Sequence, residues 1–152
     1  MLKIATPEDL KSTFRTLDQD EVDIPQDMKF PIGLKQTLKW IEPSGARIFF
    51  VFEDPVLHRP FGLVFHRNPG TPAPINMCDW CHSVRGGNEV NLLTVKADDH
   101  RRVGAHLCQN LDCVEKLSKP PGVNDIRESF DQTERRARLM NRISEFARKN
   151  FF

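Results

Sequence analysis

The sequence has little charge imbalance and lacks the marks of an exported or membrane protein. Its 152 residues carry a formal net charge of +1, which does not favour a strongly basic nucleic-acid-binding protein. It contains no run of about 18 apolar residues, which excludes a typical membrane-spanning helix. The first ten residues contain no apolar core of a signal peptide, so we expect a cytoplasmic protein.

Cysteine is scarce too, and its arrangement is the most informative feature of the chain. The four cysteines form two close pairs, Cys78 with Cys81 and Cys108 with Cys113, and 26 residues separate the pairs. Each short loop can supply half of a tetrahedral coordination sphere, and thiolates select zinc or iron–sulfur over hard cations. The spacing therefore predicts one structural zinc ion held by all four cysteines.

Three other interpretations use the same residues. Residues Cys78 to His82 match the C-x-x-C-H pattern of covalent haem attachment, which would leave the second cysteine pair without a role. A thioredoxin-like redox C-x-x-C should begin a helix after a strand, whereas Gly86 and Gly87 follow this motif in a turn-rich segment. Disulfides would require a secreted protein.

The chain before the cysteines predicts one helix and two paired strands. Thr6 is a good N-cap and Pro7 a good first helical residue, so we expect a helix over residues 7–17 and a connector over residues 18–33. Residues 46–53 are β-branched and aromatic on both faces, which is typical of a central strand. After a turn at Asp54 and Pro55, residues 61–67 should form its antiparallel partner.

The order of elements around the cysteines predicts a treble clef. The Cys78–Cys81 loop forms a knuckle, followed by strands over residues 90–95 and 103–107 that form a hairpin. Cys113 then falls where a helix should begin, with Asp112 as its cap, and we expect the helix N-terminus to favour the Cys113 thiolate. We therefore expect an α+β fold: an antiparallel sheet with a treble-clef four-cysteine zinc finger and a long C-terminal helix.

The C-terminal helix should span residues 124–150. Its predicted apolar stripe comprises Ile126, Phe130, Ala137, Met140, Ile143 and Ala147, widened by Leu139 and Phe146. Arginine and lysine crowd its second half, which suits the negative end of a helix dipole and a solvated outer face.

Taken together, these residues resemble the elongation-factor-G-binding (FBP-type) treble-clef zinc-finger family, which forms the C-terminal half of the fusidic acid resistance proteins of the FusB type. The matching strings are Met77-Cys78-x-x-Cys81, Gly87-x-x-Val90-x-Leu92, and Val103-Gly104-x-x-Leu107-Cys108-x-x-Leu111-x-Cys113. The resemblance implies one domain over residues 1–152. Its parts would be an N-terminal helix and strands (1–76), the zinc finger (77–119) and the terminal helix (124–150).

The resemblance also implies a function. Members of this family bind the translational GTPase elongation factor G without catalysing a reaction, and the resistance proteins help to release it from stalled ribosomes. Two features depart from the family: His106 stands where an aromatic residue is common, and the resistance proteins carry a separate N-terminal helical bundle. Exposed residues of the zinc finger are the candidate partner contacts, namely Trp80, Arg101 and Arg102.

The residues alone leave two other functions open. A zinc-stabilised RNA-binding module would use Arg85, Arg101, Arg102 and the terminal arginines. A treble-clef nuclease would need histidines that hold a catalytic metal, and no histidine follows Cys113. The central arginines and Trp80 also have ordinary structural explanations, because a four-thiolate zinc needs nearby cations and tryptophan packs well in a core.

Overall fold

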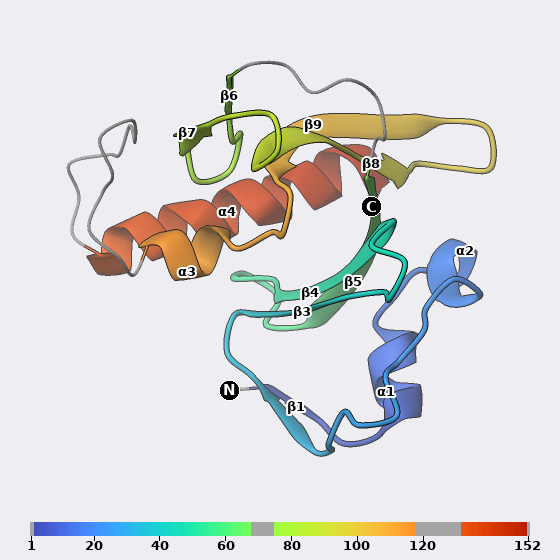
Figure 1. Ribbon diagram of the computed structural model, residues 1–152. Helices are drawn as coiled ribbons and strands as arrows, with labels where there is room; N and C mark the ends of the chain where they lie inside the picture. The colour runs from blue at the N-terminus through green and yellow to red at the C-terminus, as the bar shows by residue number, and fades with distance from the viewer. Residues whose placement is uncertain (1, 68–74, 118–131, 152) are drawn as a thin grey trace.

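The computed structural model describes residues 2–67, 75–117 and 132–151. Five strands form one antiparallel sheet in the order β3-β4-β5-β8-β9, and two smaller sheets pair β1 with β2 and β6 with β7 (Figure 1). The α+β class predicted from the sequence is confirmed. None of the described helices is long and apolar enough to cross a membrane. The elements are β1 (Leu2–Ile4), α1 (Pro7–Ser12), α2 (Thr16–Gln19), β2 (Ile32–Leu34), β3 (Thr37–Ile41), β4 (Arg47–Glu53), β5 (Pro60–Arg67), β6 (Asn76–Met77), β7 (Val84–Arg85), β8 (Val90–Lys96), β9 (Arg102–Cys108), α3 (Cys113–Leu117) and α4 (Gln132–Phe151).

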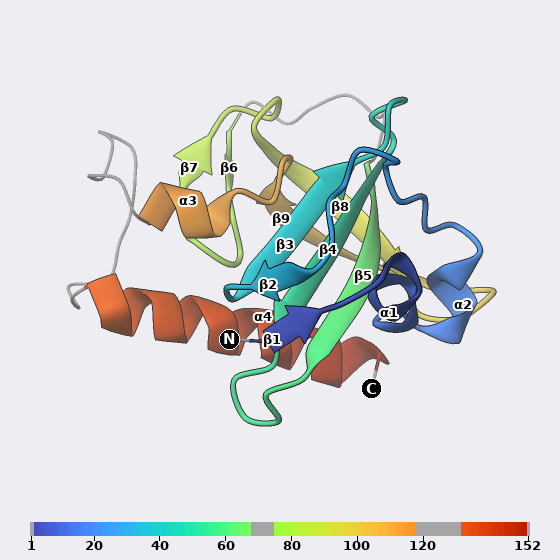
Figure 2. The same ribbon diagram turned by 90° about the horizontal axis from the view of Figure 1, so that it is seen from below.

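Strand β4 separates two apolar cores. Successive side chains of a strand point to opposite faces, so Phe50 and Phe52 belong to the core beneath α4, whereas Phe49 and Val51 belong to the core beneath the N-terminal elements. Figures 1 and 2 show α4 on one side of the sheet and β1, β2 and α1 on the other. The predicted central strand covered on both faces is confirmed, and so are its partner β5 and the β8–β9 hairpin.

The N-terminal core depends on one close approach between α1 and the sheet. Phe14 follows α1 and forms an isolated bridge with Gly62 of β5, and the Gly62 N–H donates to the Thr13 carbonyl at 2.9 Å. A Cβ atom on Gly62 would lie 2.7 Å from the Phe14 ring, so only glycine allows the ring to lie flat on the strand. The ring also makes edge contacts with Trp40 and Phe49.

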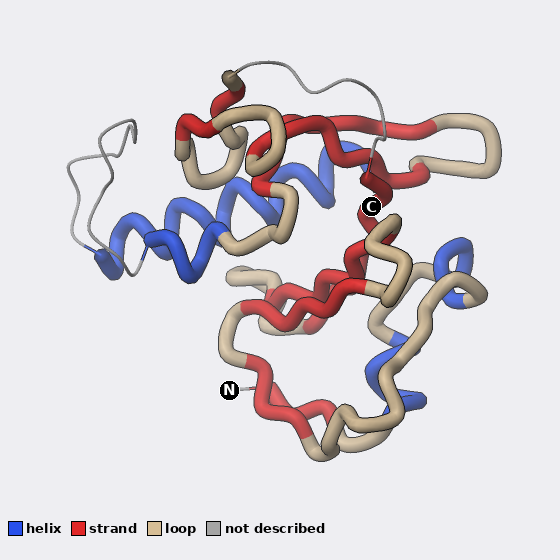
Figure 3. Tube along the Cα trace, viewed as in Figure 1, coloured by secondary structure: helices blue, strands red, loops and turns tan. Residues whose placement is uncertain are grey.

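This bridge explains why the helix predicted over residues 7–17 is shorter. Thr6 caps α1 as expected, accepting from the Asp9 N–H at 3.1 Å, but α1 ends at Ser12. Because the Thr13 carbonyl bonds to the sheet, the chain leaves the helical path, and Leu17 belongs to a second short helix, α2. The predicted connector over residues 18–33 likewise contains the end of α2 and the start of β2 (Figure 3).

Helix α4 covers the other face of the sheet and is fastened to the β4–β5 turn. The buried Asp54 carboxylate accepts from the backbone N–H groups of Val56 and Leu57, and from the Ser144 hydroxyl and the Arg148 guanidinium of α4. The turn predicted at Asp54 therefore also anchors a helix that lies 90 residues further along the chain.

The predicted C-terminal helix is confirmed where the structure describes it. Residues 124–131, including the predicted contacts of Ile126 and Phe130, lie outside the described residues. Leu139, Met140, Ile143 and Ala147 are buried as predicted. Ala137 is exposed, so the apolar stripe is narrower than the sequence indicated.

We expect Gly62→Ala to lower the free energy of unfolding by about 1–3 kcal/mol, because the added methyl group overpacks the Phe14 ring. Urea denaturation monitored by tryptophan fluorescence measures this loss. The double variant Gly62→Ala, Phe14→Leu should be more stable than the sum of the two single changes predicts. Strict additivity would contradict the direct contact.

Candidate metal centre

The first cysteine pair lies in the turn of the small β6–β7 hairpin. The Cys78 N–H donates to the Ser83 carbonyl, and the His82 N–H donates back to the Cys78 carbonyl, both at 2.9 Å. These bonds fold the loop tightly, so that the Cys81 N–H lies 3.5 Å from the Cys78 Sγ atom. An N–H group aimed at a thiolate sulfur stabilises its negative charge.

The second pair joins the sheet to a helix. Cys108 is the last residue of β9, and Cys113 is the first residue of α3, as predicted. The loop between them is held from the sheet: Arg67 donates to the Gln109 carbonyl at 2.8 Å, and Lys39 donates to the Asn110 carbonyl at 2.8 Å. The loop that positions two cysteines is thus fixed by cations from distant strands.

A direct contact joins the two halves of the site. The Asp79 N–H donates to the His106 carbonyl at 2.8 Å, and the His106 N–H donates to the Asp79 carboxylate at 3.2 Å. The knuckle therefore pairs with the outer edge of β9, which brings its cysteines next to Cys108. This order of knuckle, hairpin and helix is the predicted treble clef.

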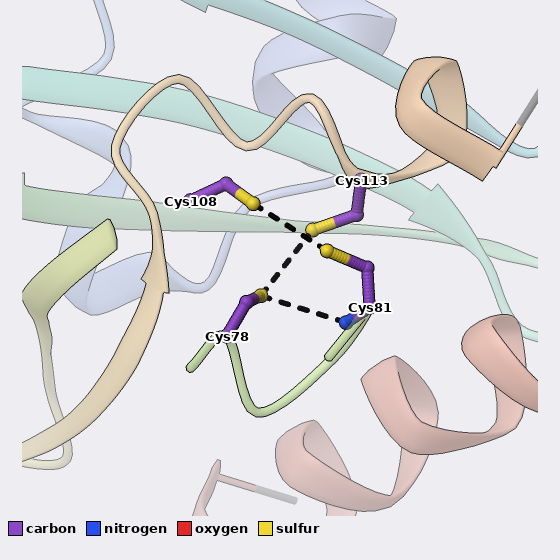
Figure 4. A group of neighbouring side chains, drawn as sticks. All are labelled: Cys78, Cys81, Cys108 and Cys113. Carbon is purple, nitrogen blue, oxygen red and sulfur yellow. Dashed lines mark hydrogen bonds between the residues drawn. The ribbon is translucent and has the colours of Figure 1, made fainter. Parts of the chain in front are cut away.

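All four cysteines predicted as zinc ligands meet at one point (Figure 4). Their sulfur atoms lie within 4.8 Å of one another, with Cys78 and Cys113 3.6 Å apart and Cys81 and Cys108 3.5 Å apart. All four are buried, and none forms a disulfide. This arrangement gives Cys108 and Cys113 a role as ligands, whereas haem attachment at Cys78 and Cys81 would leave them without one. It suits one zinc ion, which would hold the two loops together.

The four buried thiols influence one another's ionisation. The pKa of Cys81 is lowered by hydrogen bonds from Cys108 and Cys113, whereas the pKa of Cys113 is raised by its contact with Cys108, by the other thiols and by burial. We expected the helix N-terminus to favour the Cys113 thiolate, and for the zinc-bound cluster this stays a prediction. A divalent cation bound among the four sulfur atoms would lower the pKa of every thiol and so favour all four thiolates.

Lys116 supplies part of the positive charge that the sequence led us to expect from arginine. It lies one helical turn after Cys113, and its Nζ atom is 3.3 Å from the Cys108 sulfur. Burial alone would lower the pKa of Lys116, but the charge of Cys108 raises it. The i, i+3 spacing from Cys113 on a predicted helix was the signal that could have identified this residue.

Both cysteine loops use a residue in the left-handed backbone region that is not glycine. His82 has φ of 62° and Leu111 has φ of 50°. Such a conformation costs roughly 1–2 kcal/mol for a residue with a Cβ atom. It persists because the loop hydrogen bonds, and zinc when bound, fix the path of the backbone.

Trp80, which we predicted as a candidate partner contact, is part of the core. It is 3% exposed, and its ring contacts the rings of Phe50, Phe65 and Phe146 at centroid distances of 5.6, 5.7 and 5.8 Å. Arg142 of α4 donates to the Trp80 carbonyl at 2.7 Å. The knuckle is thereby packed between sheet and helix, so the structure gives Trp80 a core-packing role, and its predicted contact with a partner stays a prediction.

Arg101 and Arg102 lie on the surface at the β8–β9 hairpin. Arg101 has a side chain that is 70% exposed and lies 4.0 Å from the Asp98 carboxylate. Arg102 begins β9 opposite Lys96 and is exposed. Neither contacts the cysteine cluster, so their contribution to partner binding stays a prediction.

A comparison with protein-family models agrees with this site. A family model described as the FBP C-terminal treble-clef zinc-finger matches residues 10–149. The chain belongs to this zinc-finger family. No curated protein matches the sequence. Among solved structures, the fusidic acid resistance protein FusC is similar with a TM-score of 0.45 and 18% identity, over 77% of this chain and 56% of that protein. The chain thus matches just over half of the length of FusC.

We expect one zinc ion per chain, measured by native mass spectrometry. A structural zinc site contributes about 10–16 kcal/mol at neutral pH, which is comparable to or larger than the net stability of a domain, about 5–15 kcal/mol. Chelation or Cys113→Ser should therefore unfold at least the segment between Cys78 and α3, which hydrogen exchange would report. A metal-free protein of full stability, or a mass loss that indicates disulfides, would contradict the assignment.

Lys116→Met should weaken zinc binding about tenfold, because it removes a cation that compensates the Cys108 thiolate. Competition with a chromophoric chelator measures the affinity. Lys11→Met, on the exposed surface of α1, removes the same charge far from the cysteines and serves as the matched control. Equal zinc affinities for the two variants would show that Lys116 does not stabilise the thiolates.

Proposed function

We propose that this protein binds elongation factor G without catalysing a reaction, and that binding modulates release of the factor from the ribosome. The observation that carries the proposal is family membership over residues 10–149. The strings that place the chain in the family are concentrated between Met77 and Cys113, so the zinc-bearing half is the part that we assign to partner binding. A protein with this function would act in the cytoplasm.

The chemistry of the cysteine cluster supports a role without catalysis. A catalytic zinc site keeps one coordination position for water or substrate. Here four buried thiols are available for one ion, which fills a tetrahedral coordination sphere with protein ligands. The zinc would then supply folding energy and rigidity, and the partner would be bound by the surface around it.

The β8–β9 hairpin is well suited to present such a surface. Its strands pair over seven residue positions, its loop carries Arg101, and Arg102 is the first residue of β9. The knuckle holds the far end of β9 through Asp79 and His106. Residues on a braced hairpin lose little conformational entropy on binding, which favours affinity.

We expect the purified protein to bind elongation factor G from its own organism at micromolar concentration and low salt. Replacing Arg101 and Arg102 by glutamate should slow association and flatten its dependence on salt, because charges at an interface rim mainly steer encounter. Surface plasmon resonance at several salt concentrations measures both quantities.

The control for this variant is Lys11→Glu, Lys29→Glu, which makes the same change in net charge on exposed lysines of the N-terminal part. It should leave association nearly unchanged. If the wild-type protein fails to bind the factor but binds RNA under these conditions, the function is that of a zinc-stabilised RNA-binding module, and our proposal is wrong.

A further inference from the structure

Within residues 2–67, 75–117 and 132–151, no segment pairs with the outer edge of β9 over its first half. In an antiparallel ladder, residues alternate between those that bond to the neighbouring strand and those whose N–H and C=O point away from it. The backbone N–H and C=O of His106 point away from β8, because both groups bond to Asp79. Gly104 and Arg102 lie two and four residues before His106 on β9, so their backbone N–H and C=O groups also point away from β8. Among the described residues, no hydrogen bond from another segment satisfies their outward backbone groups.

An open groove of about 440 Å³ lies beside this edge. The C-terminal half of α4 forms one wall, and residues 103–105 of β9 form the other. Figure 1 shows α4 running beneath β9. Phe146, Val103 and Ala105, together with the mostly buried Trp80, make part of its lining apolar. By register, Val103 and Ala105 share their face with Val95 and Leu93 of the core beneath α4, so one face of β9 continues into this groove.

The other face of the same edge carries the positive charge of Arg102. Arg102, Gly104 and His106 alternate with the residues that face α4, and all three are exposed. Arg102 has no ion-pair partner among the residues that the structure describes, whereas Lys96 opposite it is paired with Glu21. Gly104 carries no side chain, which leaves its backbone open to approach.

The unpaired edge of β9, the partly apolar groove beside it and the charge of Arg102 together suit one kind of binding partner. We infer that β9 binds an extended polypeptide segment by strand addition, and that the segment alternates apolar with acidic residues. Its apolar side chains would enter the groove over Phe146, and its acidic side chains would lie beside Arg102. Strand addition takes affinity from main-chain hydrogen bonds and specificity from alternate side chains.

A second copy of this chain fits the same edge poorly. Two β9 strands paired antiparallel through Gly104 and Arg102 would place the arginines of both hairpins on one side of the new sheet. Like charges at neighbouring positions destabilise such a pairing. We therefore assign the edge to a segment of a different protein with the opposite charge.

The experiment compares Gly104→Pro with Gly104→Ala. Either substitution adds a Cβ atom that meets the flexible end of the Leu92 side chain, at 2.8 Å from its Cδ1 atom. Only proline also removes the outward N–H, and that N–H takes no part in the β8–β9 ladder. Proline is tolerated at such a position of an edge strand. Zinc content and hydrogen exchange of β8 establish that both variants are folded.

The probe is the acetylated and amidated heptapeptide Ser-Val-Glu-Val-Glu-Val-Ser, titrated into isotope-labelled protein and followed by NMR. We expect saturable shifts of the Arg102 and Gly104 amides in the wild type and of the Arg102 amide in Gly104→Ala. Affinity for Gly104→Pro should be at least tenfold weaker. The Arg102→Glu variant should bind this peptide more weakly than the wild type does. A second peptide, with lysine at both glutamate positions, should bind the Arg102→Glu variant with restored affinity.

Three outcomes would overturn the inference. The first is equal affinity of the alanine and proline variants for the peptide. The second is the absence of shifts at residues 102–104 at millimolar peptide. The third is a concentration-dependent wild-type dimer that Gly104→Pro dissociates, because the edge would then be occupied by a second copy. None of these depends on whether elongation factor G is the partner of this protein.

Discussion

Four thiols that must share one small buried volume impose the main constraint on this structure. Their sulfur atoms lie within 4.8 Å of one another, and burial opposes ionisation of the whole set until a cation compensates it. Two groups around them reduce that cost, namely the Cys81 N–H aimed at Cys78 and the Lys116 ammonium beside Cys108, while Arg67 holds the loop before Cys113 in place. Zinc would complete this arrangement and join two loops, one before β8 and one after β9, that meet at the same end of the β8–β9 hairpin.

The zinc finger is not an isolated module, because its knuckle is part of the main core. Trp80 contributes its ring to the aromatic cluster under α4, and its carbonyl accepts from Arg142. Asp79 at the same time pairs with the edge of β9. The knuckle therefore positions the metal, packs the helix and covers half of an exposed strand edge. No described segment pairs with the other half, to which we assign an extended segment of a partner.

Sequence reasoning succeeded where a pattern has one dominant physical cause. The paired cysteines indicated one metal centre, because few other functions require that spacing. Residues 46–53 indicated a doubly covered strand, because both of its faces are apolar. The helix predicted over residues 13–17 was wrong, because the Thr13 carbonyl bonds to Gly62 although the helical spacing of apolar residues continues. Strand β3 was not predicted either. Local pattern carries no information about a distant glycine that leaves room for a phenylalanine ring.

By itself, the sequence determined the chemistry of the protein: four thiol ligands, a strand apolar on both faces, and an amphipathic C-terminal helix. The tertiary structure alone decided how those parts are used. It placed Trp80 in the core rather than on the surface, brought Lys116 and Arg67 to the cysteine loops, and left Gly104 and Arg102 on an open edge beside α4. The physical reason is that residue type fixes what a group can bond to, whereas burial and pairing depend on contacts between segments far apart in the chain.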